Sequence, residues 1–390
     1  MAGTTRRVSL GIFALLAATL AATLLIGVAL ADSRGHGHPR ANQRGAPPTF
    51  TTIFKSTAGL EGLTGDGKGN LYSALRGPTG SPCPVERVSL RGGAAAVVGF
   101  VPAPCGPAGL TFDARGRLYV TGAGAQGDEI AVLTPDAANP PTATTFATGV
   151  PGANGVAFDR LGNLWISDGV AAQGRVWRVG PAGGAATEVF RIQTMANAAG
   201  VGRDVRSLPP GASQAIVANG LAFTPRGSLL VADTARGAIW KVELDNRGNV
   251  RSPLGCDTTF PADTLCLDAV FAQHPFLEGA DGIALDRAGN IWTAANERNA
   301  IVVVGPRGGV TEFFRNPPSA STQLRNEGPL EFPTSPFLAG RTFCIAQSDG
   351  SRRDNAPNSG GEVGPGTGFA AKISCLDQPL RVSGLPLPVR

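Results

Sequence analysis

Four residues with oxygen-donor side chains occupy one position of a repeated sequence cassette. Two carry carboxylates and two carry carboxamides, and each directly precedes a glycine: Glu61, Asn154, Asn219 and Asp281. Two carboxylates held close together repel each other unless a positive charge neutralises them, as a divalent cation does. Ca²⁺ takes carboxylate and amide oxygens as ligands, whereas Zn²⁺ prefers the His and Cys side chains that are absent from these positions. A fold that gathers the four side chains would therefore hold Ca²⁺, with Mg²⁺, Mn²⁺ or Zn²⁺ as alternative metals.

A second interpretation of the same residues is purely structural. Asn-Gly and Asp-Gly are ordinary turn dipeptides, so these residues could simply begin strands. The pattern alone leaves both interpretations open. The restriction of this position to Glu, Asn and Asp in four copies of the cassette favours the metal site.

The cassette that carries these residues occurs five times, as in "NGLAFTPRGSLLVADT". Each copy has a glycine at its second and ninth positions, apolar residues in between, and Leu or Ile at its eleventh position. The first apolar stretch predicts a buried strand, the "D-x-x-G" segment a hairpin turn, and the next apolar stretch a partner strand. Two further strands follow, as in "RVWRVGPAGG" and "ATEVFR". Four strands per repeat, at periods of 46 to 65 residues, predict the blades of a β-propeller.

A sixth, degenerate copy and the two ends of the chain complete the ring. Residues 48–56 resemble a fourth strand without predecessors, and "AKISCLDQPLRV" near the C-terminus resembles a third strand without a successor. Pairing them closes the last blade and removes an open sheet edge. We therefore expect an all-β, six-bladed propeller over residues 48–384. Its innermost strands line the axis, and their first side chains converge there: Glu61, Ala108, Asn154, Asn219, Asp281 and Thr334.

The N-terminal segment predicts export from the cytoplasm. Arg6 and Arg7 precede an uncharged run over residues 8–31 that ends in Ala-Leu-Ala, which is the pattern of a signal peptide. The run of 24 residues is also long enough to span a bilayer. We expect residues 1–31 to be a signal peptide or signal anchor and residues 32–47 a flexible tether. The protein would be periplasmic or extracellular, and membrane-tethered only if the segment is uncleaved.

Composition limits the classes of partner and supports an oxidising compartment. Removal of residues 1–31 leaves 32 basic and 29 acidic residues, a balance that does not favour a nucleic-acid partner. We expect a monomer that binds a small molecule. Six cysteines in an exported chain favour disulfides, and we expect neighbours in the sequence to pair: Cys83 with Cys105, Cys256 with Cys266, and Cys344 with Cys375.

The cassettes resemble those of the SMP-30/gluconolactonase/LRE-like superfamily of six-bladed propellers. The likeness extends from about residue 50 to 380 and is strongest in "NGLAF…VADT" and "DGIALD…GNIW". It implies that Glu61, Asn219 and Asp281 bind a divalent metal and that Asn154 contacts the metal or the substrate. It also implies hydrolysis of a lactone, through a metal-polarised carbonyl and an activated water.

One motif departs from the pattern of that superfamily. Its members commonly have Glu-Gly-Pro where this chain has Glu61-Gly62-Leu63.

Residues near the ring suggest which groups assist the chemistry. Asp281, a carboxylate expected beside the metal, is our candidate to take a proton from water, in line with what the resemblance implies. A histidine base is disfavoured, because His274 is the only histidine in the predicted propeller and a lone loop histidine is usually solvated. The second strand of each hairpin returns to the face where the first begins. We therefore expect Asp168 and Asn296 to contact substrate or to orient the axial side chains. Turn capping is the alternative for these residues, and we favour it for Asp233.

Three functions remain open at this point. The first is an exported metal-dependent lactonase, and the second is a non-catalytic propeller that binds protein or glycan with a structural calcium ion. The third is a strictosidine-synthase-like enzyme that uses an acidic side chain such as Glu278 or Asp281. Two long insertions, at residues 191–216 and 251–276, either shape the entrance to a pocket or decorate the surface.

Overall fold

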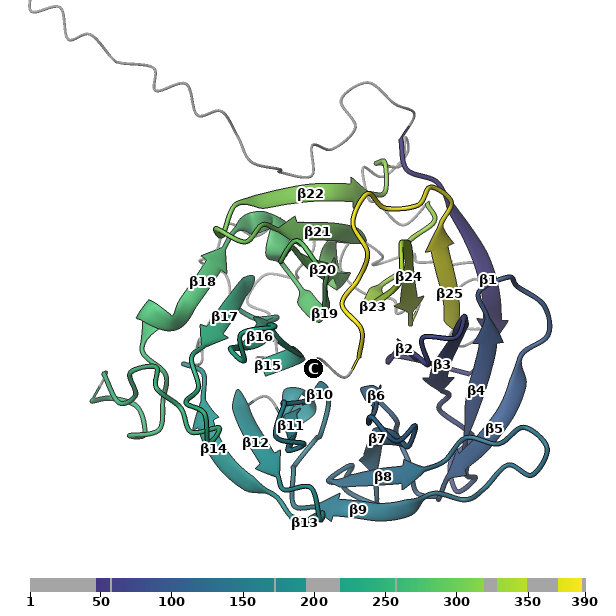
Figure 1. Cartoon of the computed structure of the whole chain (residues 1–390), viewed down its shortest axis with the longest axis horizontal. Coiled ribbons are helices and arrows are strands. Elements are labelled where there is room, and N and C mark those ends of the chain that lie inside the picture. Colours follow the sequence, from purple (N-terminus) through teal and green to yellow (C-terminus); the bar gives the residue numbers. More distant parts are fainter. Residues whose placement is uncertain are drawn as a thin grey trace, which may run out of the picture. The chain divides into compact units, whose positions relative to one another are not determined.

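The computed structural model describes a ring of six β-sheets around a central axis (Figure 1). It describes residues 47–56, 58–171, 173–193, 218–256, 258–318, 328–348 and 371–387. The predicted signal segment, all of the tether except residue 47, and most of the first insertion lie outside the described residues. Within the described residues, no helix is both long enough and apolar enough to cross a membrane.

Each sheet contains four strands that follow chain order from the axis outward, except that the N-terminal strand is the outermost strand of the sixth sheet. The second sheet adds a short fifth strand. Blade 1 consists of β2 (Thr64–Gly65), β3 (Asn70–Ala74), β4 (Cys83–Ser89) and β5 (Ala96–Val101). Blade 2 consists of β6 (Leu110–Phe112), β7 (Leu118–Ala123), β8 (Glu129–Leu133), β9 (Thr144–Thr148) and the added β13 (Gly184–Ala185). Blade 3 consists of β10 (Val156–Phe158), β11 (Leu164–Ser167), β12 (Arg175–Val179) and β14 (Thr187–Arg191).

The remaining three blades follow the same order. Blade 4 consists of β15 (Ala218–Phe223), β16 (Leu229–Asp233), β17 (Ala238–Val242) and β18 (Val270–Gln273). Blade 5 consists of β19 (Ala280–Leu285), β20 (Ile291–Ala295), β21 (Ala300–Val304) and β22 (Val310–Arg315). Blade 6 consists of β23 (Pro333–Ala339), β24 (Thr342–Gln347), β25 (Ala371–Leu376) and β1 (Phe50–Ser56). The prediction of a six-bladed propeller is confirmed.

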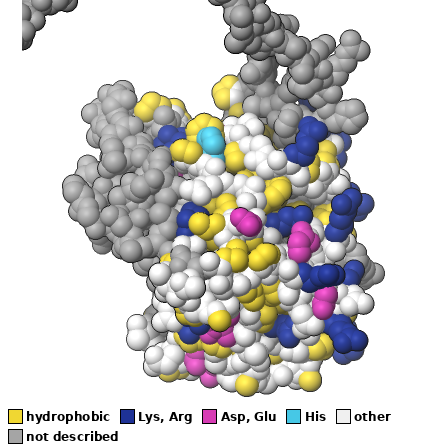
Figure 2. Space-filling view, turned by 90° about the vertical axis from the view of Figure 1, so that its left-hand side faces the viewer, with side chains coloured by type: hydrophobic (Ala, Val, Ile, Leu, Met, Phe, Trp, Pro, Cys, Tyr) yellow, Lys and Arg dark blue, Asp and Glu magenta, His cyan; other side chains and the backbone are white. Residues whose placement is uncertain are grey.

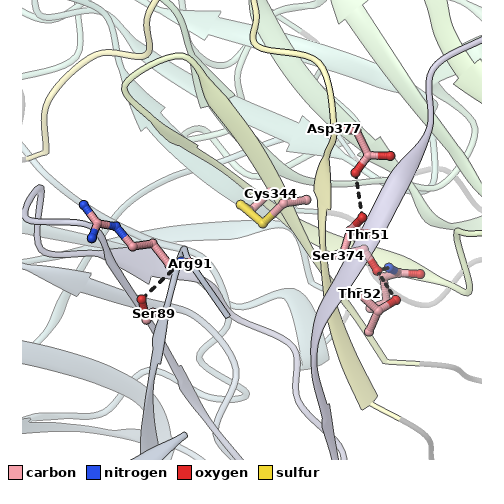
Figure 3. Close-up of a disulfide and its surroundings, with 9 residues drawn as sticks. Thr51, Thr52, Ser89, Arg91, Cys344, Ser374 and Asp377 are labelled. Carbon is pink, nitrogen blue, oxygen red and sulfur yellow. Dashed lines mark hydrogen bonds between the residues drawn. A yellow bond between two sulfur atoms is a disulfide. The ribbon is translucent and has the colours of Figure 1, made fainter. Parts of the chain in front are cut away.

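The last blade is closed by the N-terminal strand, as the sequence predicted. β1 pairs antiparallel with β25, from Phe50 opposite Leu376 to Ser56 opposite Ala371. Side chains reinforce this closure: Thr51 donates to Asp377 at 2.7 Å, and the hydroxyls of Thr52 and Ser374 are 3.0 Å apart (Figure 3).

Three disulfides join cysteines that are close in the sequence. All three pairings expected from the sequence are present: Cys83–Cys105, Cys256–Cys266 and Cys344–Cys375. Cys344 and Cys375 lie directly opposite each other on β24 and β25, so this bridge reinforces the closing blade (Figure 3).

The turn between the first two strands of a blade is held by a buried aspartate in several copies. In blade 3, Asp159 Oδ1 accepts hydrogen bonds from the backbone N–H groups of Leu161 and Asn163, each at 2.9 Å. Asp159 Oδ2 accepts from the Asn163 side chain at 2.8 Å and from Trp165 Nε1 at 2.9 Å. Asp286 makes the same four contacts in blade 5. This arrangement explains why the "D-x-x-G" segment recurs.

The innermost strands approach one another too closely for side chains at the glycine that follows each axial residue. A Cβ atom added at Gly155 would lie 2.1 Å from the carbonyl oxygen of Asn219, in the next blade. A Cβ atom added at Gly220 would lie 2.5 Å from the carbonyl oxygen of Asp281. Real Cβ atoms essentially never come within 3.0 Å of another heavy atom in this way. The glycine is therefore required by packing between blades around the axis.

Hydroxyl groups bind the same axial carbonyls. Thr121 donates to the carbonyl oxygen of Asn154 at 2.7 Å, and Ser167 donates to that of Asn219 at 2.7 Å. These bonds reach from one blade to the next, so they fix the backbone on which the axial side chains stand.

Apolar side chains fill the space between blades. Trp165 and Trp240 belong to one buried cluster shared by blades 3 and 4. Tyr72 of blade 1 meets Phe112 of blade 2 edge-on, with ring centroids 4.9 Å apart.

The described part of the second insertion lies against the outer rim of the ring. Leu265 N–H donates to the carbonyl oxygen of Arg191 at 2.9 Å, and Arg191 N–H donates to that of Asp263 at 3.2 Å. Arg191 ends β14, the outermost strand of blade 3. The insertion thus decorates the rim and links blades 3 and 4. Acidic, basic and apolar side chains are interspersed on this side of the ring (Figure 2).

Gly220→Ala tests the packing around the axis. Its Cβ would meet backbone atoms of Asp281, Gly282 and Ile283 between 2.5 and 2.8 Å, and a backbone cannot rotate away as a side chain can. We expect a loss of about 3 kcal/mol in the free energy of unfolding, measured by urea denaturation. Gly180→Ala is the control, because no atom lies within 4 Å of its added Cβ. Equal stability of the two variants would contradict the packing argument.

Candidate functional site

Three of the four predicted metal ligands line one central cavity. Asn154, Asn219 and Asp281 border a cavity of about 110 Å³ on the axis, and each side chain is at most 3% exposed. The residues that follow them, Gly155 and Gly220 among them, form the cavity wall. The close packing of the inner strands therefore brings these three side chains together at the central cavity.

A hydrogen bond holds the axial side chain in three blades, and its partner always lies fifteen residues later. Asn296 Nδ2 donates to Asp281 Oδ2 at 2.8 Å. Asn219 Nδ2 donates to Thr234 Oγ1 at 3.2 Å. The partner stands just after the second strand of the blade, which returns antiparallel to the face where the first strand begins. The hairpin itself thus orients each axial side chain.

In blade 1 the residue fifteen positions after the axial Glu61 is an arginine, and its side chain binds the Glu61 carboxylate. Arg76 Nη2 lies 2.6 Å from Glu61 Oε2, and the two side chains are 48% and 16% exposed. Glu61 is not among the residues that line the central cavity. Arg76 is a partner of the ring that the sequence motifs did not predict. Its spacing of fifteen residues from Glu61, which matches that of Asn296 from Asp281, is the signal that would have found it.

Blade 3 lacks the partner, because the residue fifteen positions after Asn154 is Gly169. A Cβ atom added at Gly169 would lie 2.9 Å from Asn154 Nδ2. Asn154 Nδ2 is buried without a hydrogen-bond partner, and so is Asn296 Oδ1 beside Asp281. A buried polar atom without a partner costs about 1–3 kcal/mol, so these two atoms are positions at which a ligand would be stabilised.

The two aspartates expected beside the ring are engaged within their own blades. Asp168 is fully buried, and both of its carboxylate oxygens accept hydrogen bonds from Arg175, at 2.8 and 2.6 Å. Burial raises the pKa of Asp168. Asp233 accepts from the backbone N–H of Arg236 and from Trp240 Nε1, which agrees with the expected capping role. Burial raises the pKa of Asp233 to about 6.

His274 and Glu278 are also tied to local partners. His274 Nδ1 accepts from the backbone N–H of Phe276 at 3.1 Å, so this side chain caps the short helix η4 (Pro275–Leu277). Glu278 is 2% exposed and lies 3.8 Å from the guanidinium of Arg298.

The donor set of the cavity fits a hard divalent cation. One carboxylate and the amide oxygens of two asparagines match the ligands of Ca²⁺ or Mg²⁺. Among the described residues, no group of three or more His, Cys, Asp or Glu side chains could hold a metal, which disfavours a zinc-type site. Asn219 and Asp281 are the residues that would hold the cation, and Asn154 lies beside them to contact the cation or the substrate. The unpaired Oδ1 of Asn296 offers a further oxygen.

The C-terminal segment covers part of the central channel at the end away from the axial side chains Asn154, Asn219 and Asp281. Leu385 N–H donates to the carbonyl oxygen of Leu285 at 2.9 Å, and Gly384 N–H donates to that of Gly340 at 2.8 Å. Leu385 and Leu387 line the cavity, and the yellow chain end reaches the centre of the ring in Figure 1. This apolar cover lies at the hairpin-turn face, so the polar donors mark the other end of the cavity.

Solved structures of several enzymes and binding proteins share this fold. A luciferin-regenerating enzyme has a TM-score of 0.55 and 16% identity, with 87% of this chain and 97% of that chain covered. The calcium-binding protein regucalcin from Agrobacterium tumefaciens has a TM-score of 0.54 and 18% identity, with 87% and 95% covered. The PQQ-bound aldose sugar dehydrogenase from Streptomyces coelicolor has a TM-score of 0.52 and 14% identity, with 85% and 99% covered. At these identities the likeness shows the fold alone.

A family model gives a more specific result. Curated proteins gave no match to the chain. The model of the SMP-30/gluconolactonase/LRE-like region matches residues 152–325, which include Asn154, Asn219 and Asp281. The resemblance found in the sequence is confirmed. Residues 152–325 of this chain are therefore similar to the SMP-30/gluconolactonase/LRE-like family.

Proposed function

We propose that this protein is a divalent-metal-dependent hydrolase that opens a lactone at the central cavity. The observation that carries the proposal is the convergence of Asn154, Asn219 and Asp281 on one cavity, with an unpaired buried amide at its wall. The family relation supports the reaction class, and Ca²⁺ is our proposed metal because the donors are carboxylate and amide oxygens. A solved structure of similar fold is described as a calcium-binding protein.

Four residues have distinct roles in the proposed reaction. Asn219 and Asp281 would hold the cation. When bound, the cation would polarise the lactone carbonyl and lower the pKa of a bound water. Among the described residues that line the cavity, Asp281 alone carries a carboxylate, so it is the group that takes the proton from the attacking water. Asn296 orients that carboxylate through its bond to Oδ2. Asn154 Nδ2, buried and without a partner, donates to the substrate oxygen that becomes negative.

The alternative enzyme class receives less support from the geometry. A strictosidine-synthase-like reaction would need a free acidic group in the funnel, and Glu278 is buried near the guanidinium of Arg298. The central donors are better matched to a metal ion. Asp168 and Asn296 stay proposed substrate contacts, although both Asp168 oxygens already accept from Arg175.

The cellular setting is part of the proposal. Three disulfides are typical of an oxidising compartment, which supports export by residues 1–31. We propose a periplasmic or extracellular monomer that acts on a small molecule.

Calcium titration of the EDTA-treated protein tests the metal site. Asp281→Asn removes the carboxylate that the described cavity lining supplies, and we expect Ca²⁺ affinity to fall at least about tenfold in isothermal titration calorimetry. Asp245→Asn, in a surface turn of blade 4, is the matched control and should bind like the wild type. Equal affinity of wild type and Asp281→Asn would place any bound calcium elsewhere.

Turnover of a panel of γ- and δ-lactones tests the reaction. We expect hydrolysis that EDTA abolishes and Ca²⁺ restores. Asn154→Ala should lower kcat about 100-fold, because it removes a donor to the developing oxyanion. The control is Asn249→Ala, whose side chain lies in an exposed turn. Hydrolysis that is insensitive to EDTA, or unchanged in Asn154→Ala, would contradict the proposed roles.

A further inference from the structure

Blade 1 places a full positive charge where blades 2 to 5 have a neutral residue. Arg76 stands fifteen residues after the axial Glu61 and contacts its carboxylate at 2.6 Å. The equivalent residues are neutral or lack a long side chain: Ala123, Gly169, Thr234 and Asn296 in blades 2 to 5. Among blades 1 to 5, a positive charge at this position is therefore specific to blade 1.

The contact between Arg76 and Glu61 changes the charge that the ring offers to a cation. Glu61 and Asp281 together would present two negative charges at the axis. With Glu61 held by Arg76, Asp281 is the one carboxylate that borders the cavity. The affinity of an oxygen-ligand site for Ca²⁺ depends on the number of charged ligands, so the ion pair leaves a weaker site.

The exposure of the pair allows Glu61 to change partners. The Arg76 side chain is 48% exposed, and an ion pair this open to water is only weakly stabilising. The backbone beneath Glu61 is fixed, since Thr334 Oγ1 donates to its carbonyl oxygen at 2.6 Å and Gly62 borders the cavity. The side chain of Glu61, and not its backbone, is therefore the part that would move to exchange the guanidinium for an ion at the ring.

We propose that Arg76 is a built-in competitor for Glu61 that weakens divalent-cation binding at the central ring. The inference rests on the proposed metal site. It adds that the charge of Arg76 sets the affinity of that site and that Glu61 is a ligand only when the guanidinium releases it.

Calorimetric titration of Ca²⁺ into four forms of the full-length protein tests this competition. Arg76→Gln keeps a hydrogen-bonding amide but removes the charge, and we expect binding about tenfold tighter than in the wild type. Arg76→Lys keeps the charge and should stay near the wild-type affinity. Arg91→Gln removes an exposed charge elsewhere in blade 1 and should change nothing. Thermal unfolding confirms that each variant is folded.

A double-mutant cycle separates competition for Glu61 from a general effect of charge. If Arg76 acts through Glu61, Arg76→Gln should tighten binding in the wild type but not in Glu61→Gln. An unchanged dissociation constant in Arg76→Gln would overturn the inference, and so would the same gain in both backgrounds.

The outcome for Asp281→Asn keeps this inference separate from the proposed function. If Asp281→Asn abolishes binding while Arg76→Gln leaves it unchanged, the metal site stands and the competition fails. If Asp281→Asn binds as tightly as the wild type, the proposed site itself fails. If the wild type binds no calcium but Arg76→Gln does, the competition stands, and the calcium-dependent reaction proposed for the wild type fails.

Discussion

The close contact between a glycine and a carbonyl group around the propeller axis is the constraint on which this structure depends. At Gly155 and Gly220 the backbone of one inner strand lies directly against the axial carbonyl of the next blade. No side chain fits there, so the glycine cannot vary. The residue before it supplies that carbonyl from its backbone, and its side chain is not part of the contact. This explains why the cassette keeps its glycine while the preceding residue differs from blade to blade.

The same constraint concentrates polar groups in a place that water barely reaches. Asn154, Asn219 and Asp281 are nearly fully buried, which is unfavourable unless each finds a partner. The hairpin supplies one to Asn219 and to Asp281 from a residue fifteen positions later. It supplies none to Asn154, where that residue is a glycine. Asn219 and Asp281 are therefore held in place by hydrogen bonds, whereas the buried amide of Asn154 lacks a partner. This combination suits a cavity that receives a ligand.

The sequence predicts the fold well because its signals are local and repeated. The glycine pattern and the turn aspartates, such as Asp159, define each hairpin, and the unmatched end strands predict the pairing of β1 with β25. The partners of the axial side chains were harder to predict. Nothing in the cassette shows that Asp168 binds Arg175, because that bond depends on how the third strand aligns with the second. The length of the second insertion likewise could not show that it packs on the rim, since its contacts are made with a strand of another blade.

We propose that one cation binds on the axis between Asn219 and Asp281. Anomalous diffraction from crystals grown with Mn²⁺ tests it most directly, because the signal locates the ion without assuming its ligands. A cation at this position should give a strong peak in the central cavity, within about 2.5 Å of side-chain oxygens of these residues. Ions found only at other positions of the molecule, or none at saturating Mn²⁺, would contradict it.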